Sequence, residues 1–189
     1  MNIRRGFKTE AKSLALELRT ELGLGPYVPF DPYALAAEYG ISVVALSELD
    51  CAERAHFLKR DGSALSGALI PDGTSVIILD NDAQMVVRRR TTMSHELAHV
   101  VLEHAFGLSL ADERKCGLGG AQEEEADWLA GELLVPYGAA LRLARAGATD
   151  EIVAQRMDVS LAVARWRMNG SGARKVAARA RSRWASTRR

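Results

Sequence analysis

The chain lacks several features that would define its class at once. No apolar run reaches the ~18 residues of a membrane-spanning helix, so we expect no membrane segment. The charged N-terminus is not followed by an apolar stretch, and no secretory signal is evident. Only two cysteines occur, Cys51 and Cys116, and two isolated cysteines form neither a disulfide framework nor a cysteine metal site. These absences predict a cytoplasmic protein with reduced thiols.

Acidic residues are missing from the C-terminal end. Residues 159–189 contain nine Lys or Arg and no Asp or Glu, although the whole chain of 189 residues carries a net charge of only +1. Such a segment can bind nucleic acid or an acidic partner, or it can be a solvated or disordered terminus. Its basic residues would spread around a helix rather than form one stripe. We therefore favour the solvated or disordered terminus, and nucleic acid is not the partner we expect.

The most informative motif present is a His-Glu-x-x-His pentad at residues 95–99. Residues four apart on a helix share a face, so His95 and His99 are spaced to hold one metal ion. Glu96 lies beside them, where a carboxylate can take a proton from water. The alternative, two surface histidines on an amphipathic helix, is less consistent with the apolar residues that surround the pair, Met93, Leu97, Val100 and Val101.

A second acidic segment follows at residues 123–136. A zinc site built on two histidines needs a third protein ligand, and a carboxylate is a common one. Glu123 and Asp127 lie four apart and face the same way as an apolar stripe, where a carboxylate is costly unless it is paired or bound to a cation. We interpret Glu123 as the third ligand. Asp127 is placed to accept the outer ring N–H of a ligand histidine.

Other ligand assignments stay open. His104 is an alternative third histidine, but a metzincin places that histidine ten residues after the first, and this position holds Ala105. Glu124 or Glu125 could replace Glu123. A run of glutamates at a helix start is otherwise ordinary, because carboxylates favour the positive end of the helix dipole.

These motifs resemble the ImmA/IrrE family of metallopeptidases. The likeness rests on RTTMSHELAHVVLEH at residues 90–104 and on the glutamate segment that ends LLVP at residue 136. The strand before the pentad, 76–81, and the opening helix, 11–24, are also similar. The resemblance covers roughly residues 7–140. Two departures are mild: Asp127 stands where many relatives have Asn, and Trp128 where many have Phe.

The resemblance implies a zinc-dependent endopeptidase. It assigns His95, His99 and Glu123 to Zn²⁺ and makes Glu96 the catalytic base, which agrees with the interpretation of the residues themselves. It also implies a protein substrate, because family members often cleave a helix-turn-helix transcriptional repressor. The alternative is a non-proteolytic regulatory protein with a structural metal site, which would bind DNA or a repressor through its basic C-terminal segment.

Periodicity and turn signals predict an α+β fold, zincin-like, with a small, mostly antiparallel sheet packed on the pentad helix and additional helices. We divide the chain into a metallopeptidase domain, 1–140, and a helical, basic extension that packs on it, 141–189. Helices are expected near 9–22, 32–40, from 82 or 83 to before 107, and 123–136. Strands are expected at 41–46, weakly at 55–59, and at 65–70 and 74–79 around an Asp72-Gly73 hairpin turn, with a loop at 108–120.

Three further features are predicted: a strand edge for the substrate, a helical hairpin and an oxyanion donor. An exposed strand edge, at 65–70 or 76–79, is expected to bind the substrate backbone unless both strands are fully paired. Residues 149–168 resemble a helix-turn-helix hairpin, with Arg165 and Arg167 on its second helix, although we favour packing or partner recognition over DNA contact. An additional donor to the oxyanion is expected from His56, Tyr137 or Arg90.

Overall fold

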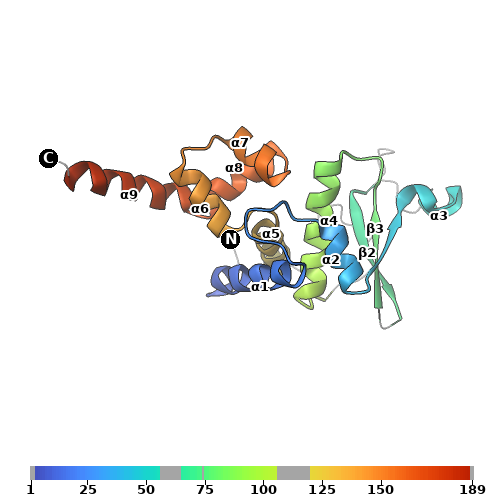
Figure 1. Cartoon of the computed structure of the whole chain (residues 1–189). Helices are drawn as coiled ribbons and strands as arrows, with labels where there is room; N and C mark the ends of the chain where they lie inside the picture. The colour runs from blue at the N-terminus through green and yellow to red at the C-terminus, as the bar shows by residue number, and fades with distance from the viewer. Residues whose placement is uncertain (1–2, 56–64, 74, 106–119, 188–189) are drawn as a thin grey trace.

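A small sheet lies at one end of an otherwise helical molecule (Figure 1). The structure is a computed structural model that describes residues 3–55, 65–73, 75–105 and 120–187. The strands are β1 (Ser42–Ala45), β2 (Gly67–Asp72) and β3 (Ser75–Asp80), in the order β1-β3-β2. β3 pairs antiparallel with β2 and parallel with β1, so the sheet is mixed rather than mostly antiparallel.

The β2–β3 hairpin confirms the turn prediction. Asp72 pairs with Ser75, and Gly73 between them has a φ of +60°, a conformation that glycine adopts without strain.

The position of β3 in the centre of the sheet determines which strand edge could bind a substrate. Because β3 is paired on both sides, the alternative that residues 76–79 form a free edge is wrong. Among the described residues β2 pairs only with β3.

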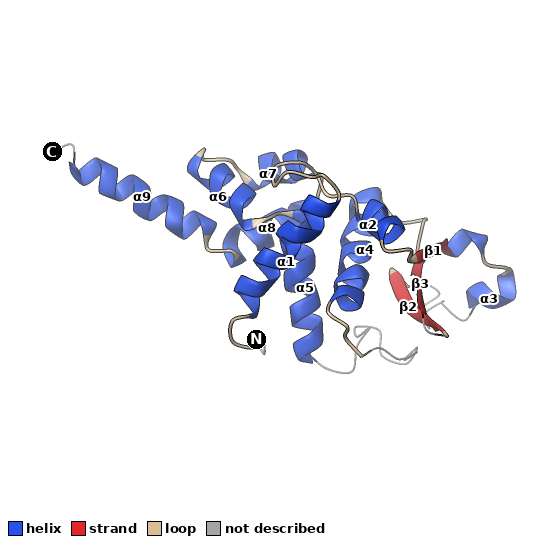
Figure 2. Ribbon diagram, turned by 60° about the horizontal axis from the view of Figure 1, so that its bottom comes forward, coloured by secondary structure: helices blue, strands red, loops and turns tan. Residues whose placement is uncertain are grey.

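The helix α4 (Val86–Val101), which carries the pentad, lies between the sheet and the helix α5 (Gly120–Leu134) (Figures 1 and 2). One side of it contacts β2 and β3, and another contacts α5. The helix α1 (Phe7–Glu21) packs on α5, and α2 (Pro32–Glu38) packs on α4 and β1. Met93, Leu97 and Leu129 at these contacts are fully buried. The pentad helix is thus held from several sides.

Several predicted elements are confirmed and two are wrong. The helix α2 begins after Asp31, whose side chain accepts a hydrogen bond from the Tyr33 N–H, as the Asp-Pro pair predicts. The helix α4 begins at Val86 and not at residue 82 or 83, because Asn81 and Asp82 form a turn whose side chains bond Ala83 and Ser47. A 3₁₀ turn (Leu46–Glu48) and the helix α3 (Cys51–Ala55) follow β1, so residue 55 is helical rather than extended. The rest of that predicted strand, 56–59, and residues 108–119 of the predicted loop 108–120 lie outside the described residues, whereas Gly120 begins α5 rather than ending a loop.

The C-terminal part is helical, as expected. It contains α6 (Tyr137–Arg145), α7 (Asp150–Met157), α8 (Leu161–Gly170) and α9 (Ala173–Thr187). Thr149 and Ser160 cap α7 and α8 through hydrogen bonds from Ile152 N and Val163 N. The helix α9 extends away from the rest of the molecule (Figure 1), so this basic terminus is a helix rather than a disordered tail. None of the described helices has both the length and the apolar character to cross a membrane.

Candidate metal centre

Three side chains from α4 and α5 meet at one point. The Nε2 atoms of His95 and His99 lie 3.1 Å apart. The two carboxylate oxygens of Glu123 lie 3.4 Å from these nitrogens, Oε2 near His95 and Oε1 near His99. These ligand atoms all lie within 4.8 Å of one another. The side-by-side packing of α4 and α5 therefore brings the second acidic segment to the pentad.

The spacing of these atoms fits a tetrahedral metal. Zinc binds histidine nitrogen and carboxylate oxygen at about 2.0–2.2 Å, so neighbouring ligand atoms of a tetrahedron lie about 3.3–3.6 Å apart. The observed separations of 3.1 and 3.4 Å are close to this range. Two histidines and one carboxylate also suit a divalent ion whose fourth position stays open for water or substrate. The residues present therefore fit such an ion.

Asp127 forms a hydrogen bond with Nδ1 of His95, the ring nitrogen that does not face the other ligands. Its Oδ1 lies 2.9 Å from Nδ1 of His95, and because a carboxylate is only an acceptor, this nitrogen must donate. In the neutral ring, the form that binds a metal ion, Nε2 of His95 is then an acceptor that faces the acceptor oxygens of Glu123, whereas a protonated ring donates to them. A cation between them would satisfy both groups. The structure places Asp127 where the sequence predicted an outer partner.

His104 and Glu125 form a corresponding series of polar contacts that begins at Nδ1 of His99. The Nδ1 atoms of His104 and His99 lie 3.0 Å apart, and Nε2 of His104 lies 3.6 Å from Glu125 Oε2. Arg4 Nε in turn donates to Glu125 Oε1 at 3.2 Å. Burial, and next the neighbouring His99, lower the pKa of His104, which favours the neutral ring. His104 and Glu125, two of the three residues weighed as alternative ligands, therefore lie behind the ligand triangle rather than in it.

The electrostatics of Glu123 suit a ligand. Burial alone would oppose ionisation of this carboxyl, but hydrogen bonds and charge from His95 and His99 outweigh it and lower its pKa to about 2. The carboxylate is therefore ionised at any physiological pH. An ionised oxygen is the form that binds a metal ion.

Glu96, the residue after His95 in the chain, is buried, with 2% of its surface exposed. The start of β2 lies directly against this part of α4. A Cβ built on Gly67 would meet Thr92 Cγ2 at 2.6 Å and would lie 3.9 Å from Glu96 Cγ. Glycine at this position therefore lets the edge strand approach the pentad. The sequence alone does not indicate this contact, because a glycine in a strand does not identify the residues that it packs against.

Of the three predicted oxyanion donors, the two that the structure describes make contacts elsewhere. Arg90 donates to the Phe30 carbonyl and pairs with Asp158 in the α7–α8 turn, so it joins α4 to the C-terminal hairpin. The ring of Tyr137 lies 3.8 Å from the ammonium of Lys12. His56 lies outside the described residues. We therefore assign no residue to this role.

For Arg167 of α8, the less favoured alternative of DNA contact is wrong. Arg167 is fully buried and pairs with the equally buried Glu132 of α5 at 2.7 Å, whereas Arg165 is exposed. A buried guanidinium cannot reach a phosphate.

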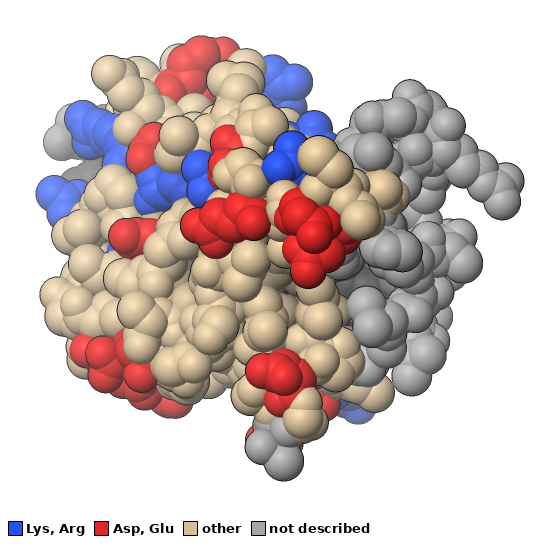
Figure 3. All heavy atoms as spheres, turned by 90° about the vertical axis from the view of Figure 1, so that its right-hand side faces the viewer, with Lys and Arg blue, Asp and Glu red and all other residues tan. Residues whose placement is uncertain are grey.

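On the described part of the face at the sheet end, acidic and basic side chains lie next to one another (Figure 3). That part of the surface is therefore of mixed charge and does not form a basic or an acidic patch.

Comparison with known families agrees with this geometry. A family model, Peptidase_M78, described as the IrrE N-terminal-like domain, matches residues 36–169. The chain belongs to this family. The match includes the pentad, Glu123 and Asp127, and it confirms the resemblance noted in the sequence. As a member of this family of metallopeptidases, the chain carries a His/Glu group suited to a metal. The match also runs past residue 140 into α8, and the domain boundary at that residue stays a prediction.

A similar fold is found among solved structures. A Mycobacterium tuberculosis transcriptional regulator matches with a TM-score of 0.55 and 19% sequence identity over 82% of this chain. The chain spans 45% of the length of that regulator. At this level of identity the likeness shows the fold alone. A comparison with curated proteins gives no match.

Proposed function

We propose that the chain is a zinc-dependent endopeptidase that cleaves a peptide bond in a specific protein. The observation that carries this proposal is the triangle of His95, His99 and Glu123 with the buried Glu96 adjacent to it. A purely structural metal site does not need a base at this position. Zinc is the ion that two histidines and a carboxylate most commonly hold in peptidases. Membership of a metallopeptidase family supports the same conclusion.

When bound, zinc would supply a Lewis acid that acidifies water and polarises the peptide carbonyl. The chain's own residues supply the rest. A carboxylate oxygen of Glu96 takes a proton from the attacking water and returns it to the nitrogen of the leaving amine. Asp127 and His104 hold the outer nitrogens of His95 and His99, and so keep both Nε2 atoms directed inward.

The edge of β2 is the proposed binding site for the substrate backbone. An extended peptide can add to a free strand edge through main-chain hydrogen bonds. Gly67, at the start of β2, brings that strand against α4 next to Glu96. A peptide on this edge would pass close to the catalytic carboxylate. β3 is unsuitable, because both of its sides are paired.

We propose a transcriptional regulator with a helix-turn-helix domain as the target. The family resemblance supports this class of substrate, and the similar solved structure is itself named as a transcriptional regulator. Such a target places the reaction in the cytoplasm. Arg165 of α8 is exposed and pairs with Asp150 at the surface, where a protein partner can contact it.

Removal of the metal tests the proposal directly. The purified chain, stripped by a chelator and reloaded with zinc, is incubated with a native extract of its host cells, and new protein N-termini are identified by mass spectrometry. We expect a small set of new termini, in a transcriptional regulator, that appear only with the zinc-loaded chain. The stripped chain without added metal is the control. If the zinc-loaded chain generates no terminus beyond those of the stripped chain, the proposed endopeptidase function is wrong for the proteins of that extract.

The contact between His104 and His99 predicts an effect on metal affinity. Replacing His104 with alanine removes the partner of the outer nitrogen of His99 and leaves the three ligands in place. Outer partners of this kind are typically worth about 10–100-fold in metal affinity, so zinc should bind that much more weakly. Competition with a chromophoric chelator measures the change. Glu103→Ala, at the exposed neighbouring residue, is the control and should bind zinc like the wild type. Equal zinc affinity in His104→Ala would contradict the assignment.

A further inference from the structure

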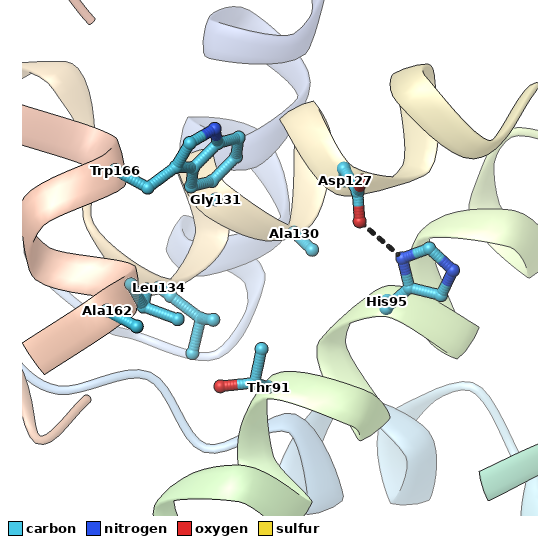
Figure 4. A pocket seen from close by; sticks show the side chains of 9 residues that line it. Thr91, His95, Asp127, Ala130, Gly131, Leu134, Ala162 and Trp166 are labelled. Atoms are coloured by element: carbon cyan, nitrogen blue, oxygen red, sulfur yellow. Dashed lines mark hydrogen bonds and ion pairs between the residues drawn. The ribbon is translucent and has the colours of Figure 1, made fainter. Parts of the chain in front are cut away.

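An open pocket of about 340 Å³ lies beside the metal centre, between α4, α5 and α8 (Figure 4). His95 and Asp127 lie at one end of it, so the pocket borders a proposed metal ligand. Thr91, one turn before His95 on α4, also lines it. The volume falls at the lower end of the range for ligand pockets, about 300–1,000 Å³. It is large enough for one side chain of a peptide.

The far end of the pocket is apolar. Ala130 and Leu134 of α5 form one wall, and Ala162, Val163 and Trp166 of α8 form the opposite wall. Apart from the Thr91 hydroxyl and the indole nitrogen of Trp166, the polar groups of the lining lie at the end of the metal ligands, on His95 and Asp127. This division matches a bound residue whose backbone lies at the metal and whose side chain leaves water for an apolar surface.

The wall formed by α8 is held in place by an unusually close approach to α5. A Cβ built on Gly131 would lie 2.4 Å from Cζ3 of Trp166 and 2.6 Å from Cδ of Arg167, so only glycine allows this packing. The Trp166 ring also meets Trp128 edge-to-face, with centroids 6.1 Å apart. Arg167 is anchored by its buried pair with Glu132. A wall fixed in this way can discriminate between side chains of different size.

We propose that this pocket receives an apolar side chain, of leucine to phenylalanine size, from the residue adjacent to the scissile bond. The helix α8, from the segment that the sequence analysis treated as an extension, would then be part of the substrate site. This inference rests on the proposed peptidase function, because the occupant is defined by its position at the metal. It goes further by assigning a substrate preference and the residues that set it.

Hydroxamic acids test the pocket without requiring turnover, because the hydroxamate group binds zinc while its side chain samples the neighbouring surface. Binding of acetohydroxamic acid, 4-methylpentanohydroxamic acid and 3-phenylpropanohydroxamic acid to the zinc-loaded full chain is measured by titration calorimetry. We expect the two compounds with apolar side chains to bind about 10–100-fold more tightly than acetohydroxamic acid, the gain that burial of such a group provides.

Two neighbouring exposed residues provide matched variants. Ala162→Phe fills the pocket from α8 and should remove most of the gain of the two apolar side chains over acetohydroxamic acid. Leu161→Phe adds a ring at the adjacent exposed residue, which does not line the pocket, and should keep the gain. Ala162→Asp is a second test at the same position, since a carboxylate there also opposes an apolar occupant. Zinc content and thermal unfolding confirm that each variant is folded.

The outcomes separate this inference from the proposed function. If acetohydroxamic acid binds and the apolar side chains add nothing, the pocket assignment is wrong and the metal centre stands. An unchanged gain in folded Ala162→Phe and Ala162→Asp would place the side chain elsewhere and would also overturn the assignment. If no hydroxamate binds, and the chain takes up no zinc, the proposed function fails and the pocket loses its role with it.

Discussion

Glu96→Gln is expected to bind zinc like the wild type and to lose peptide hydrolysis by about 10²–10⁴-fold or more. Glutamine has nearly the shape of glutamate but cannot accept the proton of the attacking water. The ligand triangle does not include residue 96, so the metal ion keeps its three protein ligands. Zinc content by elemental analysis and the rate at which new N-termini appear measure the two effects separately.

The matched control is Glu103→Gln, the same substitution at an exposed residue just beyond α4. It should keep both zinc and hydrolysis. Turnover near the wild-type rate in Glu96→Gln would mean that another group is the base. Loss of zinc together with activity would instead make Glu96 a structural residue of the site, and the catalytic assignment would fall.

Local signals explain which parts of the fold were predictable. The Asp31-Pro32 cap, the Asp72-Gly73 turn and the apolar periodicity of α1 each act within a few residues, and each element is found. The parallel pairing of β1 with β3 depends instead on contacts between segments more than thirty residues apart. The start of α4 was misplaced because the side chains of the preceding turn bond to distant residues, including Ser47.

The same distinction applies to the metal centre. The spacing of residues 95–99 and 123–127 predicted which side chains share a helix face, and the structure brings those faces together. His104 was judged only as a ligand or a helix-end residue, because its bond to His99 depends on the path of the chain after α4. The burial of Arg167 was equally hidden, since nothing in residues 161–168 indicates a partner at Glu132.

The pair formed by Arg167 and Glu132 carries the largest predicted effect on stability. The two side chains are 0% and 1% exposed, and Arg167 also donates to the Val135 carbonyl at 3.2 Å. Arg167→Met keeps most of the side-chain volume but leaves the Glu132 carboxylate buried without its cation. Breaking a buried pair from one side costs about 3–5 kcal/mol of unfolding free energy, and urea unfolding measures this loss. Arg165→Met, on the exposed side of α8, should change stability by less than about 1 kcal/mol.

A double variant identifies the cause of that loss. Arg167→Met combined with Glu132→Leu removes the unpaired carboxylate as well, and replacement of both members of a buried pair is often close to neutral. We expect recovery of most of the stability, short of about 1 kcal/mol for the lost bond from the Tyr137 N–H to Glu132. A double variant as unstable as Arg167→Met would instead assign the loss to packing against Trp128 and Trp166. The hydroxamate gain should follow the same order, weak in the single variant and restored in the double, because the pair holds the α8 wall of the pocket in place.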